Sequence, residues 1–283
     1  MTNQPDSRVP AEIISYYNLG REDNRLRRGS GQLEFARTQE LIQRYSPPPP
    51  ASVLDVGGGS GVYAFWLAEL GYDVDLIDAV PLHIEQANAA QQNTPRPLRS
   101  ARVGDARNLP VNDNSVDVVL LLGPLYHLTD YADRIKTLQE ARRVLKPGGY
   151  IIAAAISRFA SLLDGLFREM IVDPTFVNII KEDLRTGQHR NLYNQQSFFT
   201  TSFFHHRDEL ATEINVAGFE QTQVLAIEGP GWLATNFEAH WNDPTQRENI
   251  LQFVKAVESE PTLIGVSSHL MGVGKKPRPT PTP

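Results

Sequence analysis

A glycine-rich turn is the segment whose composition points most directly to chemistry. Residues 53–61 read VLDVGGGSG, with a short apolar run before the glycines and helical spacing of apolar residues after them. A strand–turn–helix unit of this kind places backbone N–H groups and the positive end of a helix beside a ligand. Glycine allows that ligand to approach the backbone closely. The turn therefore predicts a ligand-binding site where the helix begins.

The spacing of these glycines distinguishes between classes of ligand. A dinucleotide-binding turn has the pattern G-x-G-x-x-G, but Val62 stands where its third glycine would fall. A phosphate-binding Walker loop requires G-K-[ST], which this segment lacks. The glycines at 57, 59 and 61 instead have the form G-x-G-x-G, with Asp55 two residues ahead of the first.

Strands and helices that position such a turn alternate along the chain. Short apolar runs predict strands at 51–56, 73–77, 99–103, 116–122 and 150–156, and helical spacing predicts helices at 61–70, 81–92 and 130–145. The third helix is expected to be closed by the Pro-Gly-Gly at 147–149. After a break, the pattern resumes with a helix at 207–216, a strand at 220–227, a helix at 246–257 and a strand at 263–273. This alternation predicts a parallel sheet covered on both faces.

Segments in this order resemble the motifs of class I S-adenosylmethionine-dependent methyltransferases. They are the glycine turn with Asp55, Asp78 at the end of the second strand, GDA at 104–106, the fourth strand followed by GPLYHL, and LKPGGY at 145–150. Together they cover about residues 51–156. The chain is thereby identified as a member of this family. The resemblance implies S-adenosyl-L-methionine as cofactor and S-adenosyl-L-homocysteine as product.

The resemblance also implies a fold and a domain organisation. The expected fold is α/β and Rossmann-like, with a seven-stranded, mostly parallel sheet, helices on both faces, an N-terminal helical segment and a lid insertion. We expect a helical cap and proline linker at 1–50, a methyltransferase domain at 51–275 and a disordered tail at 276–283. Within the domain, the lid insertion is expected at about 157–206 and a second insertion at about 229–260.

The cofactor-binding residues follow from the same resemblance. Asp78 is expected to bind both ribose hydroxyls, because a carboxylate is an acceptor-only group, and Asp105 to accept from the adenine amino group. Arg25 is expected to pair with the carboxylate of the methionine end. The full expected set is Tyr17, Arg25, Asp55, Gly57, Gly58, Gly59, Gly61, Asp78, Ala79, Asp105, Ala106 and Leu122. Structural roles remain alternatives for four of these residues. Asp78 could cap the next helix, Asp105 could be a turn residue, Asp55 could orient the glycine turn, and Arg25 could lie on a solvated helix face.

Methyl transfer from a sulfonium is an in-line displacement that depends mainly on alignment. His127 is the candidate base, because it follows the fourth strand, near where the family's transferred methyl lies, and an unperturbed imidazole has a pKa of about 6.5. Packing at a helix start is the alternative. The residues expected to bind the acceptor are Tyr126, His189, Arg190 and Trp232. No metal is expected, because His205 and His206 are adjacent and point apart.

Composition narrows the function classes further. The chain has 283 residues, with 27 basic and 33 acidic side chains, and a net charge of −6 gives no general attraction to nucleic acid. The absence of cysteine excludes thiolate catalysis, disulfides and Cys-ligated metals. No apolar run approaches the roughly 20 residues of a membrane span, and residues 1–10 do not resemble a secretory signal. We expect a cytoplasmic monomer or homodimer.

The expected acceptor is a small organic molecule methylated on oxygen or nitrogen, with a carbon acceptor as an alternative. Enzymes that methylate amino groups of nucleic acids commonly carry N/D-P-P-Y/F after the fourth strand, whereas this chain has GPLY at 123–126. Methyltransferases acting on a protein, peptide or RNA remain an alternative. Two further alternatives are a non-catalytic methyltransferase-like binding protein and a Rossmann dehydrogenase. The spacing of the glycines, with Val62 in place of the third, argues against the dehydrogenase.

Overall fold

A computed structural model describes the chain except for residues 1–10, 18–21, 93, 193–194, 196–197 and 280–283. Within the described residues, nine strands form one sheet with the order β3-β2-β1-β4-β5-β7-β6, and β9 pairs with β5 and β8. The strands are β1 Ser52–Val56, β2 Asp73–Asp78, β3 Ser100–Val103, β4 Val116–Leu121, β5 Leu145–Ser157, β6 Gln188–His189, β7 Ser202–His205, β8 Glu220–Ala226 and β9 His269–Lys275.

The pairing of these strands confirms the predicted fold class. Strands β1 to β5 are parallel to their neighbours, while β9 runs antiparallel to β5 and β8. The prediction of seven strands omitted β6 and β7, two short strands in the segment after β5. Strand β7 pairs with Ile156 and Ser157, the last residues of β5. The sheet is thus extended at its carboxyl edge.

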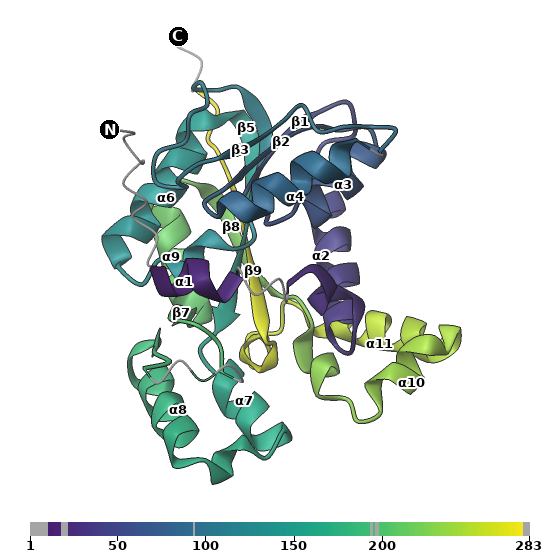
Figure 1. Cartoon of the computed structure of the whole chain (residues 1–283), viewed down its shortest axis with the longest axis vertical. Coiled ribbons are helices and arrows are strands. Elements are labelled where there is room, and N and C mark those ends of the chain that lie inside the picture. Colours follow the sequence, from purple (N-terminus) through teal and green to yellow (C-terminus); the bar gives the residue numbers. More distant parts are fainter. Residues whose placement is uncertain (1–10, 18–21, 93, 193–194, 196–197, 280–283) are drawn as a thin grey trace.

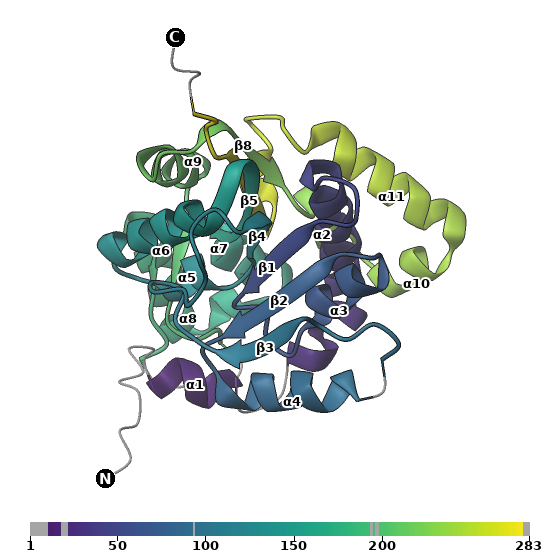
Figure 2. The same ribbon diagram turned by 90° about the horizontal axis from the view of Figure 1, so that it is seen from above.

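Helices cover both faces of the sheet (Figure 2). One face packs against α2 Gly31–Tyr45, α3 Val62–Glu69 and α4 Pro81–Gln91, and the other against α6 Tyr131–Val144 and α9 Arg207–Val216. Successive residues of β1 alternate between the two cores, since Val53 belongs to the first and Leu54 to the second. Burial on both faces explains why these strands are continuous apolar runs.

Two strand boundaries differ from the sequence predictions by more than two residues. Helix α6 ends at Val144 and β5 begins at once, five residues before the predicted strand, because Leu145 already pairs with Val116 of β4. Strand β9 begins at His269 rather than at 263, because His269 pairs with Ile156, next to the last residue of β5. Residues Ile264–Val266 instead form a 3-10 turn, η4.

Further helices lie beyond the carboxyl edge of the sheet (Figure 1). The N-terminal part contains α1 Ala11–Tyr17 and η1 Glu22–Arg27, and α5 Pro124–His127 follows β4. The segment predicted as a lid holds α7 Ala160–Phe167, η2 Met170–Val172 and α8 Pro174–Thr186 in its first part and the short strands β6 and β7 in its second. The second predicted insertion holds η3 Gly229–Leu233, α10 Phe237–Asn242 and α11 Pro244–Val257.

Part of the predicted tail belongs to the folded structure. The Lys276 ammonium donates to the carbonyl oxygen of Leu145 at 2.7 Å, which ties this residue to the start of β5. Residues 280–283 lie outside the described part of the chain. Across the residues that are described, none of the helices has the length and apolar composition needed to cross a membrane.

Candidate active site

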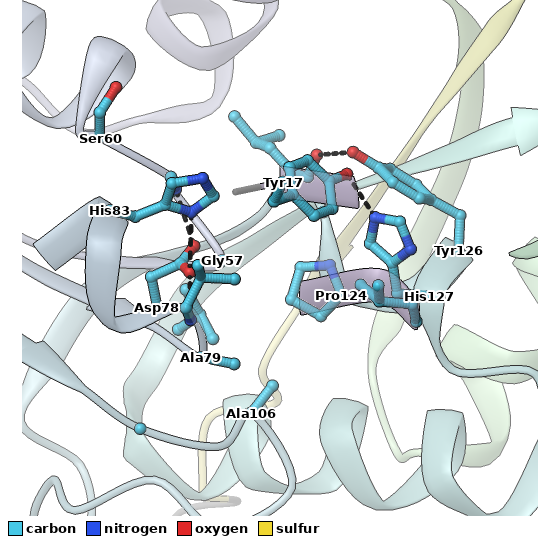
Figure 3. Close-up of a pocket in the computed structure, with 18 of the residues that line it drawn as sticks. Tyr17, Gly57, Ser60, Asp78, Ala79, His83, Ala106, Pro124, Tyr126 and His127 are labelled. Atoms are coloured by element: carbon cyan, nitrogen blue, oxygen red, sulfur yellow. Dashed lines mark hydrogen bonds and ion pairs between the residues drawn. The ribbon is translucent and has the colours of Figure 1, made fainter. Parts of the chain in front are cut away.

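A cavity opens at the carboxyl ends of the parallel strands, between the sheet and the N-terminal helices (Figure 3). We call it the first cavity. Most residues expected to bind the cofactor line it: Tyr17, Arg25, Gly57, Gly58, Gly59, Asp78, Ala79, Asp105, Ala106 and Leu122, together with Tyr126 and His127. Asp55 and Gly61 do not. This position, outside the carboxyl ends of strands, is where open α/β sheets bind ligands.

The glycine turn after β1 is shaped by close contacts. Gly57 has a φ of +72°, and a Cβ there would lie 2.6 Å from Cδ of Pro124. The backbone N–H of Gly59 donates to Oδ2 of Asp78 at 2.8 Å. The turn is therefore held between the loop after β4 and the end of β2.

Asp78 connects the turn to helix α4. Its Oδ1 accepts from the backbone N–H of Val80 at 2.8 Å and from Nδ1 of His83 at 3.0 Å. A carboxylate offers about four lone-pair sites, so that acceptor capacity remains for a ligand. His83 also lines the cavity and was not identified from the sequence. Its only sequence signal is a position in the first turn of the helix that follows Asp78.

Asp55 lies beneath the turn rather than in the cavity wall. Its side chain is fully buried, and neither carboxylate oxygen has a hydrogen-bond partner among the described residues. A Cβ on Gly58 would collide with this carboxylate. Burial, and then the negative charge of Asp78, raise the pKa of Asp55 to about 7. Gly61 also lies outside the wall, where it is the N-cap of α3.

Asp105 is fixed by Arg107, a neighbour for which the sequence predicts no role. The guanidinium of Arg107 donates from Nε to Oδ1 of Asp105 at 2.9 Å and from Nη2 to Oδ2 at 2.8 Å. Its Nη1 donates to Asp133 at 2.6 Å. Arg107 also lines the first cavity, so the acidic group beside the cavity is oriented by a buried cation.

Tyr17 and His127 form a pair across the cavity mouth (Figure 3). The Tyr17 hydroxyl and Nε2 of His127 lie 2.5 Å apart, and the ring of Tyr17 packs edge-on against His83 with centroids 5.5 Å apart. Burial lowers the pKa of His127 to about 4, despite opposing contributions from the Thr201 backbone and the Asp78 charge. The imidazole is therefore neutral at pH 7 and already engaged at Nε2.

A second cavity of about 570 Å³ adjoins the first. Tyr17, Arg25 and Tyr126 line both. Its aromatic walls are Tyr16, Phe176, Phe198, Phe199, Phe204 and Trp232. Of the residues expected to bind the acceptor, Tyr126, His189 and Trp232 lie in its wall, whereas Arg190 does not and donates to Gln188 at 2.7 Å.

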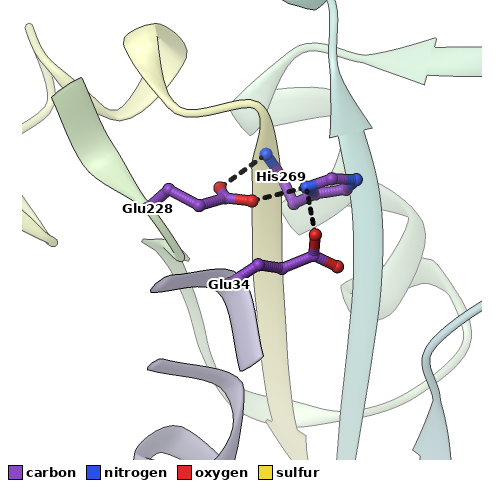
Figure 4. A group of neighbouring side chains, drawn as sticks. All are labelled: Glu34, Glu228 and His269. Atoms are coloured by element: carbon purple, nitrogen blue, oxygen red, sulfur yellow. Dashed lines mark hydrogen bonds and ion pairs between the residues drawn. The ribbon is translucent and has the colours of Figure 1, made fainter. Parts of the chain in front are cut away.

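A charged cluster lines this second cavity (Figure 4). Nδ1 of His269 lies 2.6 Å from Oε1 of Glu228 and 3.8 Å from Oε2 of Glu34. Burial lowers the pKa of His269, but the two carboxylates outweigh it and raise the value to about 9. Arg25 in turn donates to both oxygens of Glu34. Arg25, Glu34, His269 and Glu228 therefore form a chain in which cations and anions alternate. The carboxylates of Glu34 and Glu228 lie close enough to bind one metal ion together with His269, but their charges are already neutralised by the two cations.

Comparisons with known proteins agree with this geometry. Residues 54–153 match the family described as "Methyltransferase domain". The chain is 31% identical over 195 residues to a ubiquinone/menaquinone biosynthesis C-methyltransferase from Acidiphilium cryptum, a match covering 68% of this chain and 75% of that relative. It is 33% identical over 177 residues to a malonyl-[acyl-carrier protein] O-methyltransferase from Geobacter sulfurreducens, covering 62% of this chain and 58% of that relative.

Solved structures agree on the fold. A SAM-dependent methyltransferase from Methanosarcina mazei superposes with a TM-score of 0.56 at 20% identity, covering 84% of this chain and 97% of that one. The family match at 54–153 includes the glycine turn, Asp78 and Asp105, which line the first cavity. The chain belongs to the class I S-adenosylmethionine-dependent methyltransferases, with S-adenosylmethionine as its cofactor.

Proposed function

We propose that this chain transfers the methyl group of S-adenosylmethionine to an oxygen or nitrogen atom of a small organic molecule. The observation that carries the proposal is the meeting of two cavities at Tyr17, Arg25 and Tyr126. Cofactor in the first cavity and acceptor in the second would face each other there. In-line displacement requires this kind of alignment.

We assign the cofactor to the first cavity on the contacts already described. The glycine turn at 57–59 packs against the methionine and ribose portions, and Asp78 accepts from the ribose hydroxyls. Asp105 accepts from the adenine amino group, while Ala79, Ala106 and Leu122 give the ring apolar walls. Arg25 binds the methionine carboxylate by sharing its guanidinium with Glu34. Asp55 and Gly61 act indirectly, by shaping the turn.

His127 is proposed as a residue that positions Tyr17. A pKa of about 4 makes an imidazole a weak base at neutral pH, and its Nε2 already contacts the Tyr17 hydroxyl. Holding this phenol at the junction fixes the angle at which the acceptor meets the methyl group. Tyr126 forms the adjacent wall, with its ring centroid 4.7 Å from that of His127.

The second cavity favours a compact, partly apolar acceptor. Its volume lies within the roughly 300–1,000 Å³ of small-molecule sites. Much of its wall comes from 157–206, which we propose as the lid, and Trp232 comes from the second insertion, with its Nε1 donating to the Val266 carbonyl at 2.8 Å. Arg190, outside this wall, is proposed to bind at its rim. The names of the two relatives specify methylation on carbon and on oxygen. Our proposal of an oxygen or nitrogen acceptor therefore does not rest on the relatives but on the size and lining of the second cavity.

Two measurements test the proposal together. Saturating S-adenosylhomocysteine, at 100 times its dissociation constant, should add about 2.7 kcal/mol to the free energy of unfolding and raise the melting temperature by roughly 5–10 °C, with NAD as control. Transfer from methyl-labelled S-adenosylmethionine should then be measured on small phenols, amines and carboxylic acids. Stabilisation without transfer to any of them, but with transfer to a protein or RNA fraction, would contradict the small-molecule assignment.

A further inference from the structure

An aspartate–histidine pair is buried in the wall of the second cavity. Nδ1 of His189 lies 2.9 Å from Oδ2 of Asp183. Both side chains are almost wholly inaccessible, with 0% exposure for Asp183 and 1% for His189. His189 lines the cavity, whereas neither residue lines the first cavity. The pair therefore belongs to the acceptor side of the site.

The local sequence fixes both members of this pair. Asp183 lies on the buried face of α8, in line with Phe176, Ile179 and Ile180. Gly187 ends that helix in the left-handed conformation, with a φ of +75°, which turns the chain back into β6. The ring of His189 then stacks on Phe204 of β7, with centroids 4.7 Å apart and planes 7° apart. The imidazole is thus held by a carboxylate at one nitrogen and by an aromatic ring on its face.

The remaining polar atoms of the pair are left without partners. Nε2 of His189 and Oδ1 of Asp183 are both buried and have no hydrogen-bond partner among the described residues. Leaving buried polar atoms unpaired costs free energy that a purely structural pair would avoid. Because an ionised carboxylate only accepts, Nδ1 carries the proton, and in the neutral imidazole Nε2 is left with a lone pair.

We propose that His189 is the general base of methyl transfer and that Asp183 is its positioning residue. This inference rests on the proposed function. The lone pair of the acceptor oxygen or nitrogen forms a bond to the methyl carbon, and the sulfur–carbon bond breaks with its electron pair retained by S-adenosylhomocysteine. The O–H or N–H proton of the acceptor passes to Nε2 of His189. Asp183 stabilises the imidazolium that results.

The neighbours of His189 indicate how an acceptor would reach it. The ring of Phe199 lies 6.3 Å from that of His189 and 6.0 Å from that of His127. It also packs edge-on against Tyr16 at 5.6 Å. Phe199 therefore has in its reach both His127 of the first cavity and His189, so that an aromatic or apolar body resting on Phe199 would lie near both. The acceptor class is a hydroxyl or amine carried on such a body.

Kinetics of three variants test this assignment. His189→Gln should lower the rate of methyl transfer to phenols and amines by about 100-fold, while S-adenosylhomocysteine affinity stays within twofold. Asp183→Asn should lower the rate by at least about tenfold, because the amide can donate to Nδ1 and move the proton to Nε2. The matched control is His240→Gln, on α10, where the imidazole of His240 contacts the side chain of Gln246 and lines neither cavity. It should retain the wild-type rate.

A second readout needs no turnover. In the full chain with ¹⁵N-labelled histidine and bound S-adenosylhomocysteine, His189 should appear as the Nδ1–H tautomer, and Asp183→Asn should populate the Nε2–H tautomer. Added phenol should shift the Nε2 resonance, whereas anisole, which has no hydroxyl proton, should not. An Nε2–H tautomer in the wild type, or equal responses to both probes, would overturn the proposal. Failure of the wild type to bind S-adenosylhomocysteine would instead count against the proposed function.

Discussion

The two cavities differ in how the chain builds them. In the first, neighbouring residues in sequence act together: the turn at 57–59, Asp78 with His83, and Asp105 with Arg107. The second assembles distant positions, since Glu34 comes from α2 and His189 from β6. A parallel sheet brings its strand ends to one edge by topology alone, so the sheet side of the first cavity needs only local motifs, and Tyr17 and Arg25 of the N-terminal part close it. The second depends on how the inserted segments pack.

Their electrostatics differ as well. Beneath the first cavity, the buried carboxylate of Asp55 lies near that of Asp78, and burial and then the charge of Asp78 raise the pKa of Asp55 to about 7. In the second, the carboxylates of Glu34 and Glu228 flank an imidazolium. Ionisation of Asp55 is therefore unfavourable in the folded protein, whereas ionisation of His269 is favoured by its two carboxylate neighbours. Charge changes should therefore affect the two cavities with opposite dependence on pH.

The largest expected effect is on the first cavity, through Asp55→Asn. The folded-state pKa of Asp55 is raised from 3.8 to about 7, so the folded state binds more protons and wild-type stability falls as the pH rises between these values, by about 4 kcal/mol. The Asp55→Asn variant has no ionisable group at this position, so its free energy of unfolding does not fall for this reason. Urea unfolding of both proteins at pH 4 and pH 8 should show the variant gaining that amount relative to wild type. A pH-independent difference would mean that Asp55 ionises normally.

His269→Gln is the opposite case, in the second cavity. The pKa of His269 is raised from 6.5 to about 9, so its contribution is fully present below pH 6.5 and is lost as the pH rises through about 9. The contribution is about 3 kcal/mol. Urea unfolding should show that the variant has a lower free energy of unfolding than wild type, and that this deficit is larger at pH 6 than at pH 10 by about 3 kcal/mol. An equal deficit at both values would show that the cluster is not ionic.

The first cavity was more predictable from the sequence than the second. Gly57, Gly58, Gly59, Asp78 and Asp105 were predicted for the cofactor site, and they line the first cavity, because they stand in short motifs at strand ends that resemble those of the family. His83 and Arg107 lie within a few residues of those motifs, but the motifs carry no information on which neighbours orient the acids. The alternation of strands and helices was predictable, whereas the boundaries of β5 and β9 depend on pairing between strands far apart in sequence.

The acceptor side was predictable only in fragments. His189 and Trp232 were expected from composition, but Asp183 was not, because the helix that aligns it with His189 falls in a segment where no helix was predicted. Glu228 and His269 share no local pattern with Glu34, since they are brought together only when β9 pairs with β5 and β8. A cluster formed by long-range contacts leaves no period or spacing in the sequence.

Asp78→Ala would sharpen the comparison by acting on the first cavity alone. Loss of charge-assisted hydrogen bonds to the ribose hydroxyls should weaken S-adenosylhomocysteine binding by about 100-fold, or about 2.7 kcal/mol. Isothermal titration calorimetry measures this loss. Asp73→Ala, at the exposed start of the same strand, is the matched control and should bind normally. Unchanged affinity in Asp78→Ala would remove Asp78 from the cofactor site.

Tyr17→Phe has the smallest expected effect and tests the junction itself. The variant keeps the ring that packs on His83 but loses the hydroxyl that contacts His127. If that contact positions the phenol for alignment rather than for binding, kcat should fall by about tenfold, or about 1.4 kcal/mol, with S-adenosylhomocysteine affinity within about twofold. Tyr45→Phe, which removes a hydroxyl bonded to Gln223 at the exposed surface, is the control. A fall in affinity equal to the fall in kcat would mean that the Tyr17 hydroxyl acts only in binding the cofactor. Of the three described residues that line both cavities, only Tyr126 and Arg25 would then remain to align cofactor and acceptor.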